Sequence, residues 1–186
     1  MSSSVICLAG RRIDQAGATP PRFPLGNVDL VSQRLADLLR SEAAIALVCS
    51  AACGTDILAL EQAERQRLRF RIVLPFERAR FRRTSVTDRG GDWGPRFDRL
   101  TDLAENSGDL LLLNKEQEDE DRLFAAANSR IRKEAALLAR SLPDHGPRLL
   151  AIVVWEGQPR PGNDLTGDFL RGAEAEGLET RSISTI

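Results

Sequence analysis

The sequence has no excess of charge of either sign. Its 186 residues contain 26 Lys and Arg against 27 Asp and Glu, which gives a formal net charge of −1. Proteins that bind nucleic acids or membrane surfaces through charge usually carry a clear basic excess. The balance therefore argues against generic nucleic-acid binding and against a membrane-surface role.

Long apolar runs are also missing. No run approaches the roughly 18 residues that a membrane span needs. The N-terminus, MSSSVICLAGRR, lacks the basic start and the longer apolar stretch of a secretory signal. We therefore expect a cytoplasmic protein without a membrane partner.

Cysteine and histidine are scarce. The chain has three cysteines, Cys7, Cys49 and Cys53, and one histidine, His145. An odd number of cysteines in a chain that is not secreted is a poor disulfide framework. Cys49 and Cys53 have a C-x3-C spacing, but one distant histidine does not complete a zinc ligand set, so we expect no metal. Cys7 and Cys49 are instead expected to fill buried strands as small apolar residues.

No internal repeat or low-complexity linker divides the chain, and we expect residues 1–186 to form a single domain. Short runs rich in Val, Ile and Leu without polar alternation are typical of strands buried on both faces of a parallel sheet. Such runs span residues 4–9, 44–50, 70–76, 109–114 and 149–155. A sixth segment, 179–185, alternates and suits an edge strand.

Helical patterns separate these runs, at residues 27–42, 55–66, 93–106, 120–142 and 166–177. Alternating strands and helices predict the α/β class with a mainly parallel sheet. Right-handed crossovers make it a doubly wound, Rossmann-like sheet of five to six strands, in an order near 3-2-1-4-5.

Two long segments, 10–26 and 77–92, follow the first and third strands, and no obvious secondary structure is predicted for them. Long loops are often functional. Both should lie at the carboxyl edge of the sheet, where open α/β sheets bind ligands. We therefore expect the loops after residues 9, 49, 76 and 155 to converge on one cleft.

The turn SAACGTD joins the second strand to a helix. Small residues such as Ser50 and Ala51 let the backbone approach a ligand, and Gly54 permits a positive φ. A helix that begins at Thr55 offers free N–H groups to an anion. Asp56 would repel a phosphate there, and it suits ribose hydroxyls or simply the start of a helix. A tight strand–helix turn capped by Thr55 explains the same residues.

The stretch GRRID follows the first strand. Gly10 could allow close approach of a ligand, and Arg11 and Arg12 could donate charge-assisted hydrogen bonds to phosphate. Asp14 could hold the loop or a sugar. The alternative is a solvated loop.

The stretch FERARFRRTSV could form an anion clamp around Arg82 and Ser85, although arginines on such faces are usually only solvated. Trp93 and Phe97 could stack on a base, but packing is their expected role.

Asn128 lies in an apolar helical stripe and must find a partner, because an unpaired buried amide costs roughly 1–3 kcal/mol. The partner is either the backbone of a neighbouring loop or a ligand. After the fifth strand, Glu156 could pair with an arginine or bind ribose, and Thr166 and Gly167 open a helix as in the first turn.

Together, CLAGRRID, SAACGTDILALEQA, IVLPFERARFRRTSV, the W…RFD pair and WEGQPRPGNDLTGDFL resemble the SLOG superfamily over roughly residues 4–180. These are Rossmann-like domains related to the Lonely Guy phosphoribohydrolases and the DNA-processing protein A group. The resemblance implies a domain that binds nucleotides or their derivatives, often as a sensor in bacterial signalling or antiphage defence. The positions that match are Gly10, Asp14, Ser50, Gly54, Asp56, Glu61, Arg82, Ser85, Gly162, Thr166 and Gly167.

The resemblance has a departure in the last loop. Hydrolase members carry PGGxGTxxE, whereas this chain has PGNDLTGDF, with Asn163 and Asp164 in place of a tighter glycine run. No glutamate follows Thr166 at the family's spacing, which argues against hydrolase activity.

We therefore expect a non-catalytic nucleotide sensor that requires no cofactor. It could act with a separate effector protein, and it could form a homo-oligomer. One alternative is an N-glycosidase or phosphoribohydrolase acting on nucleoside monophosphates, with Glu61, Glu156 or Asp56 as the acid–base group. The other is a protein-interaction module with a vestigial site.

Overall fold

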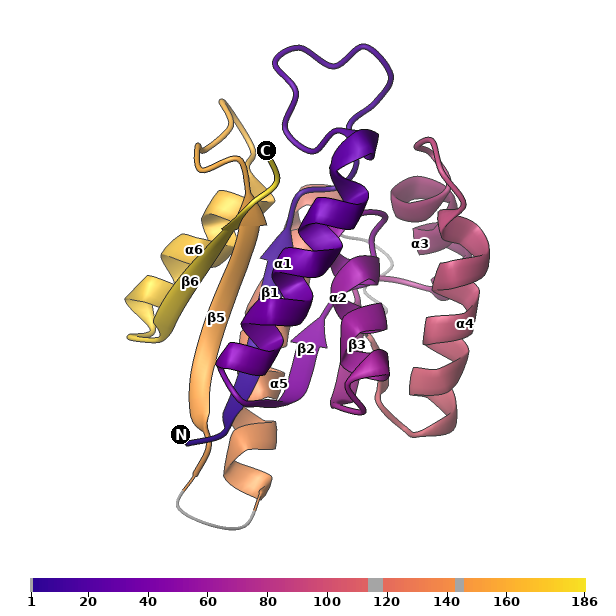
Figure 1. The fold of residues 1–186 in the computed structure, drawn as a ribbon. Helices are drawn as coiled ribbons and strands as arrows, with labels where there is room; N and C mark the ends of the chain where they lie inside the picture. Colours follow the sequence, from indigo (N-terminus) through magenta and orange to yellow (C-terminus); the bar gives the residue numbers. More distant parts are fainter. Residues whose placement is uncertain (1, 114–118, 143–145) are drawn as a thin grey trace.

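One sheet of six parallel strands forms the centre of the molecule (Figure 1). The computed structural model describes residues 2–113, 119–142 and 146–186, so His145 and Asn114, the end of the fourth apolar run, lie outside it. The strand order is β4-β3-β2-β1-β5-β6, and every neighbouring pair is parallel. The strands are β1 (Ser4–Gly10), β2 (Ala44–Cys49), β3 (Arg69–Leu74), β4 (Leu110–Leu112), β5 (Arg148–Trp155) and β6 (Glu179–Ser184). The α/β, Rossmann-like prediction is confirmed.

The fourth strand is the one departure from the expected strand order. We expected it beside the first strand, but β4 lies beyond β3 at the edge, and β5 takes the place beside β1. β4 pairs over only three residues and leaves Leu112 40% exposed. β5 is eight residues long, and its five residues from Leu150 to Val154 are buried. Burial therefore favours β5 at the centre of the sheet and β4 at its edge. The runs 109–114 and 149–155 are both short and apolar, so the sequence does not reveal this difference.

Helices cover both faces of the sheet. On one face lie α1 (Val28–Ser41), α2 (Thr55–Arg65) and α4 (Trp93–Asn106), whose buried residues join one apolar cluster. On the other face lie α5 (Glu120–Ser141) and α6 (Leu165–Ala175), which contribute to a second cluster with β1, β2 and β5. Figure 1 shows α1 and α2 in front of the sheet and α5 behind it. The strands β1 to β4 are added one after another toward one edge of the sheet, and the chain then crosses back through α5 to place β5 on the other side of β1. Because the direction of the crossovers changes there, the helices α5 and α6 lie on the opposite face.

The two long segments differ in structure. Residues 11–24 form an extended loop that projects above the carboxyl edge of the sheet and ends in the short 3₁₀ turn η1 (Leu25–Asn27) (Figure 1). The segment 77–92, expected as a loop, instead contains two helical pieces, α3 (Arg78–Phe81) and η2 (Arg82–Val86). Phe81 and Val86 are buried and hold these turns against the core.

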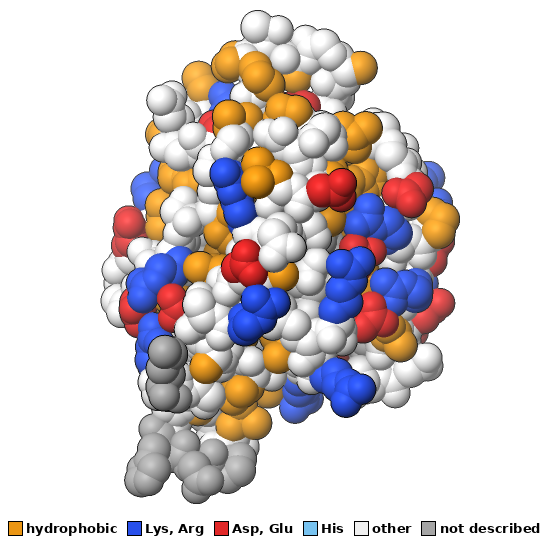
Figure 2. Space-filling view, viewed as in Figure 1, with side chains coloured by type: hydrophobic (Ala, Val, Ile, Leu, Met, Phe, Trp, Pro, Cys, Tyr) orange, Lys and Arg blue, Asp and Glu red, His pale blue; other side chains and the backbone are white. Residues whose placement is uncertain are grey.

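The surface and the interior agree with the composition. On the face that carries α1, α2 and α4, basic and acidic side chains are interspersed (Figure 2). Cys7 and Cys49 are fully buried in strands, as expected, and Cys53 is buried in the turn after β2. In the described ranges, no helix combines the length and the apolar character needed to cross a bilayer.

Candidate functional site

A pocket of about 540 Å³ opens at the carboxyl edge of the sheet, above β1 and β5. These two strands are paired along their whole shared length, to Gly10 and Val154. From their ends the chain runs to opposite faces of the sheet, toward β2 and β6. This is the topological switch point at which open α/β sheets bind ligands, and the volume is typical of a small-molecule pocket.

The four loops expected to converge all contribute to this pocket. Residues after β1, β2, β3 and β5 line it, together with one face of α5. The lining includes the predicted residues Gly10, Arg11, Arg12, Asp14, Ser50, Asp56, Ser85, Asn128 and Thr166. The other predicted residues, Ala51, Gly54, Thr55, Arg82, Glu156, Gly162, Gly167 and Glu61, do not line it.

The two glycines expected to admit a ligand are required by contacts within the chain. A Cβ on Gly10 would lie 2.4 Å from Cγ2 of Thr55, and a Cβ on Gly54 would lie 2.8 Å from the backbone nitrogen of Ile13. Gly54 has a φ of +98°, which a residue with a Cβ rarely adopts. Both glycines therefore let the loop after β1 lie directly on the turn after β2.

This loop also covers the start of α2. The carbonyl of Arg11 accepts hydrogen bonds from the Thr55 N–H at 3.3 Å and from its hydroxyl at 2.9 Å. Ile13 N–H donates to the carbonyl of Cys53 at 3.3 Å. The helix N-terminus predicted to receive an anion is therefore closed by a carbonyl of the chain itself. Thr55 does not cap the helix, because the N-cap position belongs to Gly54.

Asp56 is one of the carboxyl groups that line the pocket. Its residue is only 7% exposed, and burial raises its pKa from 3.8 to about 7, against the opposing effects of the Ala52 N–H and the charge of Arg12. The Ala52 N–H donates to Oδ2 of Asp56 at 3.1 Å. Near neutral pH this group can therefore hold or release a proton, which is the property of a general acid or base.

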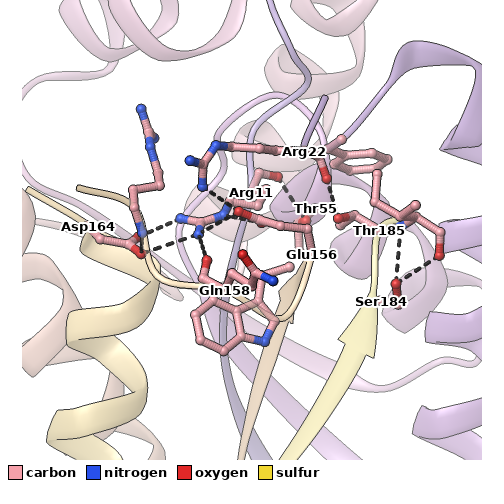
Figure 3. A network of polar contacts seen from close by, with 12 residues as sticks. Arg11, Arg22, Thr55, Glu156, Gln158, Asp164, Ser184 and Thr185 are labelled. Carbon is pink, nitrogen blue, oxygen red and sulfur yellow. Dashed lines mark hydrogen bonds and ion pairs between the residues drawn. The ribbon is translucent and has the colours of Figure 1, made fainter. Parts of the chain in front are cut away.

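A network of ion pairs joins the loop after β1 to the loop after β5 (Figure 3). Arg11 Nε donates to Oε2 of Glu156 at 2.7 Å, and Arg11 Nη1 donates to Oδ1 of Asp164 at 2.5 Å. Arg22 donates to the second oxygen of Glu156. Although burial opposes ionisation, hydrogen bonds from Arg11 and the backbone of Arg160 lower the pKa of Asp164 to about 2. Glu156 pairs with arginine, the first of the two roles considered for it.

The loop that projects over the pocket is fastened at its base. Oδ2 of Asp14 accepts hydrogen bonds from the backbone N–H groups of Arg22 and Phe23, at 2.8 and 2.9 Å. Phe23 is fully buried, and the hydroxyl of Thr185 donates to the carbonyl of Arg22 (Figure 3). Asp14 thus holds the loop, while residues 15–21 remain exposed.

Several predicted residues lie away from the pocket. Glu61 accepts from Arg96 at 2.6 Å and joins α2 to α4. Arg82 donates to Asp98 of α4 at 2.9 Å, so it takes no part in an anion clamp in this structure. Gly162 has open space around it, and Gly167 packs beside the Asp164 carboxylate. Trp93 and Phe97 are buried in the core, as expected.

Asn128 satisfies its amide with backbone. Its Nδ2 donates to the carbonyl of Leu165 at 2.8 Å, which ties α5 to the start of α6. This is the first of the two partners considered from the sequence. The residue still lines the pocket, and its side chain therefore fixes the wall that α5 and α6 share.

Sequence reasoning missed the apolar wall of the pocket. Phe81 of α3 lies with Phe124, Ala127 and Ile131 of α5 along this wall. The rings of Phe81 and Phe124 are 6.4 Å apart. Phe124 and Ile131 were visible only as members of a helical stripe, which a core helix also shows. Arg89 also lines the pocket. It lies in the long segment 77–92, but no sequence motif distinguishes it from the other arginines there.

No family model matches this chain, and a search of curated proteins finds no relative of significant similarity.

Proposed function

We propose that the chain binds a nucleotide or nucleotide derivative in the pocket above β1 and β5. The observation that carries the proposal is the pocket itself, which has an apolar wall on one side and arginine and hydroxyl groups on the other at the switch point of the sheet. The Phe81 and Phe124 side chains suit the face of a base. Ser50, Ser85 and Asp56 suit the hydroxyl groups of a ribose.

Binding without turnover is the favoured form of this function. Of the three carboxyl groups considered for catalysis, Glu61 lies outside the pocket and Glu156 is neutralised by two arginines. Asp164, at the departure from the hydrolase loop, is engaged by Arg11. These contacts support binding without turnover. The cytoplasmic location, and action with a separate effector protein or as a homo-oligomer, rest on the sequence and on its resemblance to SLOG domains.

A second candidate, an N-glycosidase acting on nucleoside monophosphates, rests on Asp56. It is the one considered carboxyl that lines the pocket, and its pKa of about 7 suits proton transfer to a leaving base at neutral pH. In this scheme the C–N bond breaks as Asp56 donates a proton to the leaving base, water forms the new C–O bond to the sugar, and the proton that water loses returns to Asp56.

Thermal shift and chromatography with adenosine, AMP, GMP and NAD test both candidates. A ligand that raises the melting temperature without release of free base supports the sensor. Release of base that disappears in Asp56→Asn establishes the enzyme instead. If none of these compounds binds or reacts, the protein-interaction module is favoured.

A matched pair of variants tests whether a ligand binds in this pocket. Ala18 and Ala16 are exposed residues of the same loop, but only Ala18 lines the pocket. Ala18→Trp should weaken binding by filling the mouth of the pocket, whereas Ala16→Trp should leave it unchanged. Equal affinity in the two variants would contradict binding at this pocket.

A further inference from the structure

Arginines line the pocket in greater number than one ion-pair network can use. They are Arg11, Arg12, Arg22, Arg89 and Arg160. Arg11 is held by Glu156, Asp164 and the carbonyl of Gln158, and Arg22 is held by Glu156. These two guanidinium groups therefore hold the loops in place. Arg12, Arg89 and Arg160 remain, and of these Arg12 and Arg89 lie against the same carboxylate.

Arg12 and Arg89 share a single carboxylate. Arg12 Nη2 pairs with one oxygen of Asp88, and Arg89 Nε lies 3.5 Å from the other. Asp56 also lines the pocket, and burial raises its pKa to about 7 against the opposing effect of the Arg12 charge. Among the described residues, Asp88 is therefore the one carboxylate that pairs directly with both guanidinium groups. Arg89 Nη1 also donates to the carbonyl of Ile13 at 2.6 Å, which keeps it beside the loop after β1.

Both arginines keep a buried Nε donor that makes no well-formed hydrogen bond. Within the described ranges this holds for Nε of Arg12 and of Arg89, although Arg89 Nε keeps its 3.5 Å ion pair with Asp88 and the Arg12 side chain also contacts Cys53. A buried unpaired donor in a folded protein calls for an explanation. Two guanidinium groups that share one carboxylate suit a phosphate, which accepts several charge-assisted hydrogen bonds at once.

The N-termini of α2 and α6, whose first turns line the pocket, are already occupied. The start of α2 is closed by the carbonyl of Arg11. At the start of α6 stands the Asp164 carboxylate, which accepts from the Arg160 N–H at 2.6 Å. An anion would therefore meet a loop carbonyl at the start of α2 and a carboxylate at the start of α6, whereas the Arg12–Arg89 pair offers two guanidinium groups that share the Asp88 carboxylate.

We infer that the ligand of this pocket carries a phosphate group, which Arg12 and Arg89 bind in place of Asp88. The inference rests on the proposed ligand pocket and specifies its chemistry. It assigns the phosphate to Arg12 of the loop after β1 and Arg89 of the segment after η2, rather than to the N-terminus of α2 or α6. The phosphate source is either a nucleotide or a free phosphorylated metabolite, and two arms of the experiment separate them.

The first arm uses inorganic phosphate and the broadening of its ³¹P resonance, at constant ionic strength. Arg12→Gln and Arg89→Gln should each weaken phosphate binding about tenfold, the effect of losing one charge-assisted contact. Arg83→Gln, an exposed arginine of η2 outside the pocket, removes the same charge and should have no effect. Asp88→Asn should strengthen binding, because it removes the competing carboxylate.

Opposite signs for Arg12→Gln and Asp88→Asn distinguish a binding site from a merely structural cluster. If the substitutions acted only by unfolding the protein, Asp88→Asn would weaken phosphate binding as Arg12→Gln does. Broadening that is absent in the native chain, that survives in both arginine variants, or that weakens in Asp88→Asn would overturn the inference.

The second arm compares AMP with adenosine by calorimetry. A preference for AMP that falls in Arg12→Gln, while adenosine affinity is unchanged, identifies a nucleotide as the phosphate source. Phosphate binding without any binding of AMP or adenosine keeps the phosphate site and overturns the nucleotide proposal. Equal affinities for AMP and adenosine keep the nucleoside pocket and overturn the phosphate site.

Discussion

Replacing Asp56 by asparagine should change how the stability of the fold depends on pH. In the folded chain, burial raises the pKa of this carboxyl group from 3.8 to about 7. In the unfolded chain it ionises near 3.8, so between these two values only the folded state keeps the proton. The stabilisation is therefore complete below about pH 4 and is lost as the pH rises through about 7.

The size of the effect follows from the two pKa values. At 1.36 kcal/mol for each tenfold change in proton affinity, a shift from 3.8 to about 7 corresponds to about 4 kcal/mol. This is an upper value, since the carboxyl faces a pocket that water can enter. It is a large part of the 5–15 kcal/mol by which domains are typically stable.

Urea unfolding at pH 5 and pH 8 provides the assay. The native chain should lose more free energy of unfolding than Asp56→Asn over this interval, because the amide cannot ionise while its oxygen can still accept from the Ala52 N–H. Asp29→Asn, on the exposed side of α1, makes the same chemical change and should behave as the native chain does. Parallel losses in the native chain and in Asp56→Asn would refute the reasoning.

Two further predictions concern how the loops are held. Gly10→Ala should lower the free energy of unfolding by about 1–3 kcal/mol, because its Cβ would overlap Thr55. In a Thr55→Gly background the same substitution should cost much less. A difference between the two costs below about 0.5 kcal/mol would contradict this explanation. Arg11→Met should cost about 3–5 kcal/mol in urea unfolding, because it removes the guanidinium partner of the buried Asp164 carboxylate and leaves Glu156 with Arg22 alone. Arg11→Met combined with Asp164→Asn should recover part of that loss, and no recovery would show that the lost stability comes from packing alone.

The sheet and the place of the pocket could be predicted because both depend on local patterns. Buried runs of Val, Ile and Leu identify strands, and parallel strands bring the loops that follow them to one edge. The position of β4 could not be predicted in this way, because a run of leucines has the same appearance at the centre and at the edge of a sheet.

Individual roles in the site were harder to predict, because one residue type serves two purposes. Gly10 and Gly54 have the signature of backbone that approaches a ligand, yet they make room for each other's loops. Arg11 is a basic residue in a loop, and nothing local shows that Glu156, 145 positions away, would engage it. Asp56 was identified because a carboxylate at the start of a helix is visible in the sequence, whereas the burial that raises its pKa is not.

The bond between Thr185 and the loop over the pocket has a practical consequence. Thr185 is fully buried, its hydroxyl donates to Arg22, and its carbonyl accepts from the Asn27 amide at 2.9 Å. Both partners flank the segment between the pocket mouth and α1. An affinity tag or fluorescent fusion joined directly after β6 would therefore strain the contacts that hold the loop at the pocket mouth. One placed before β1 would attach at the opposite edge of the sheet. Ligand screens are better run with the N-terminal fusion, and a difference in ligand affinity between the two fusions would itself measure how firmly the last strand holds the loop.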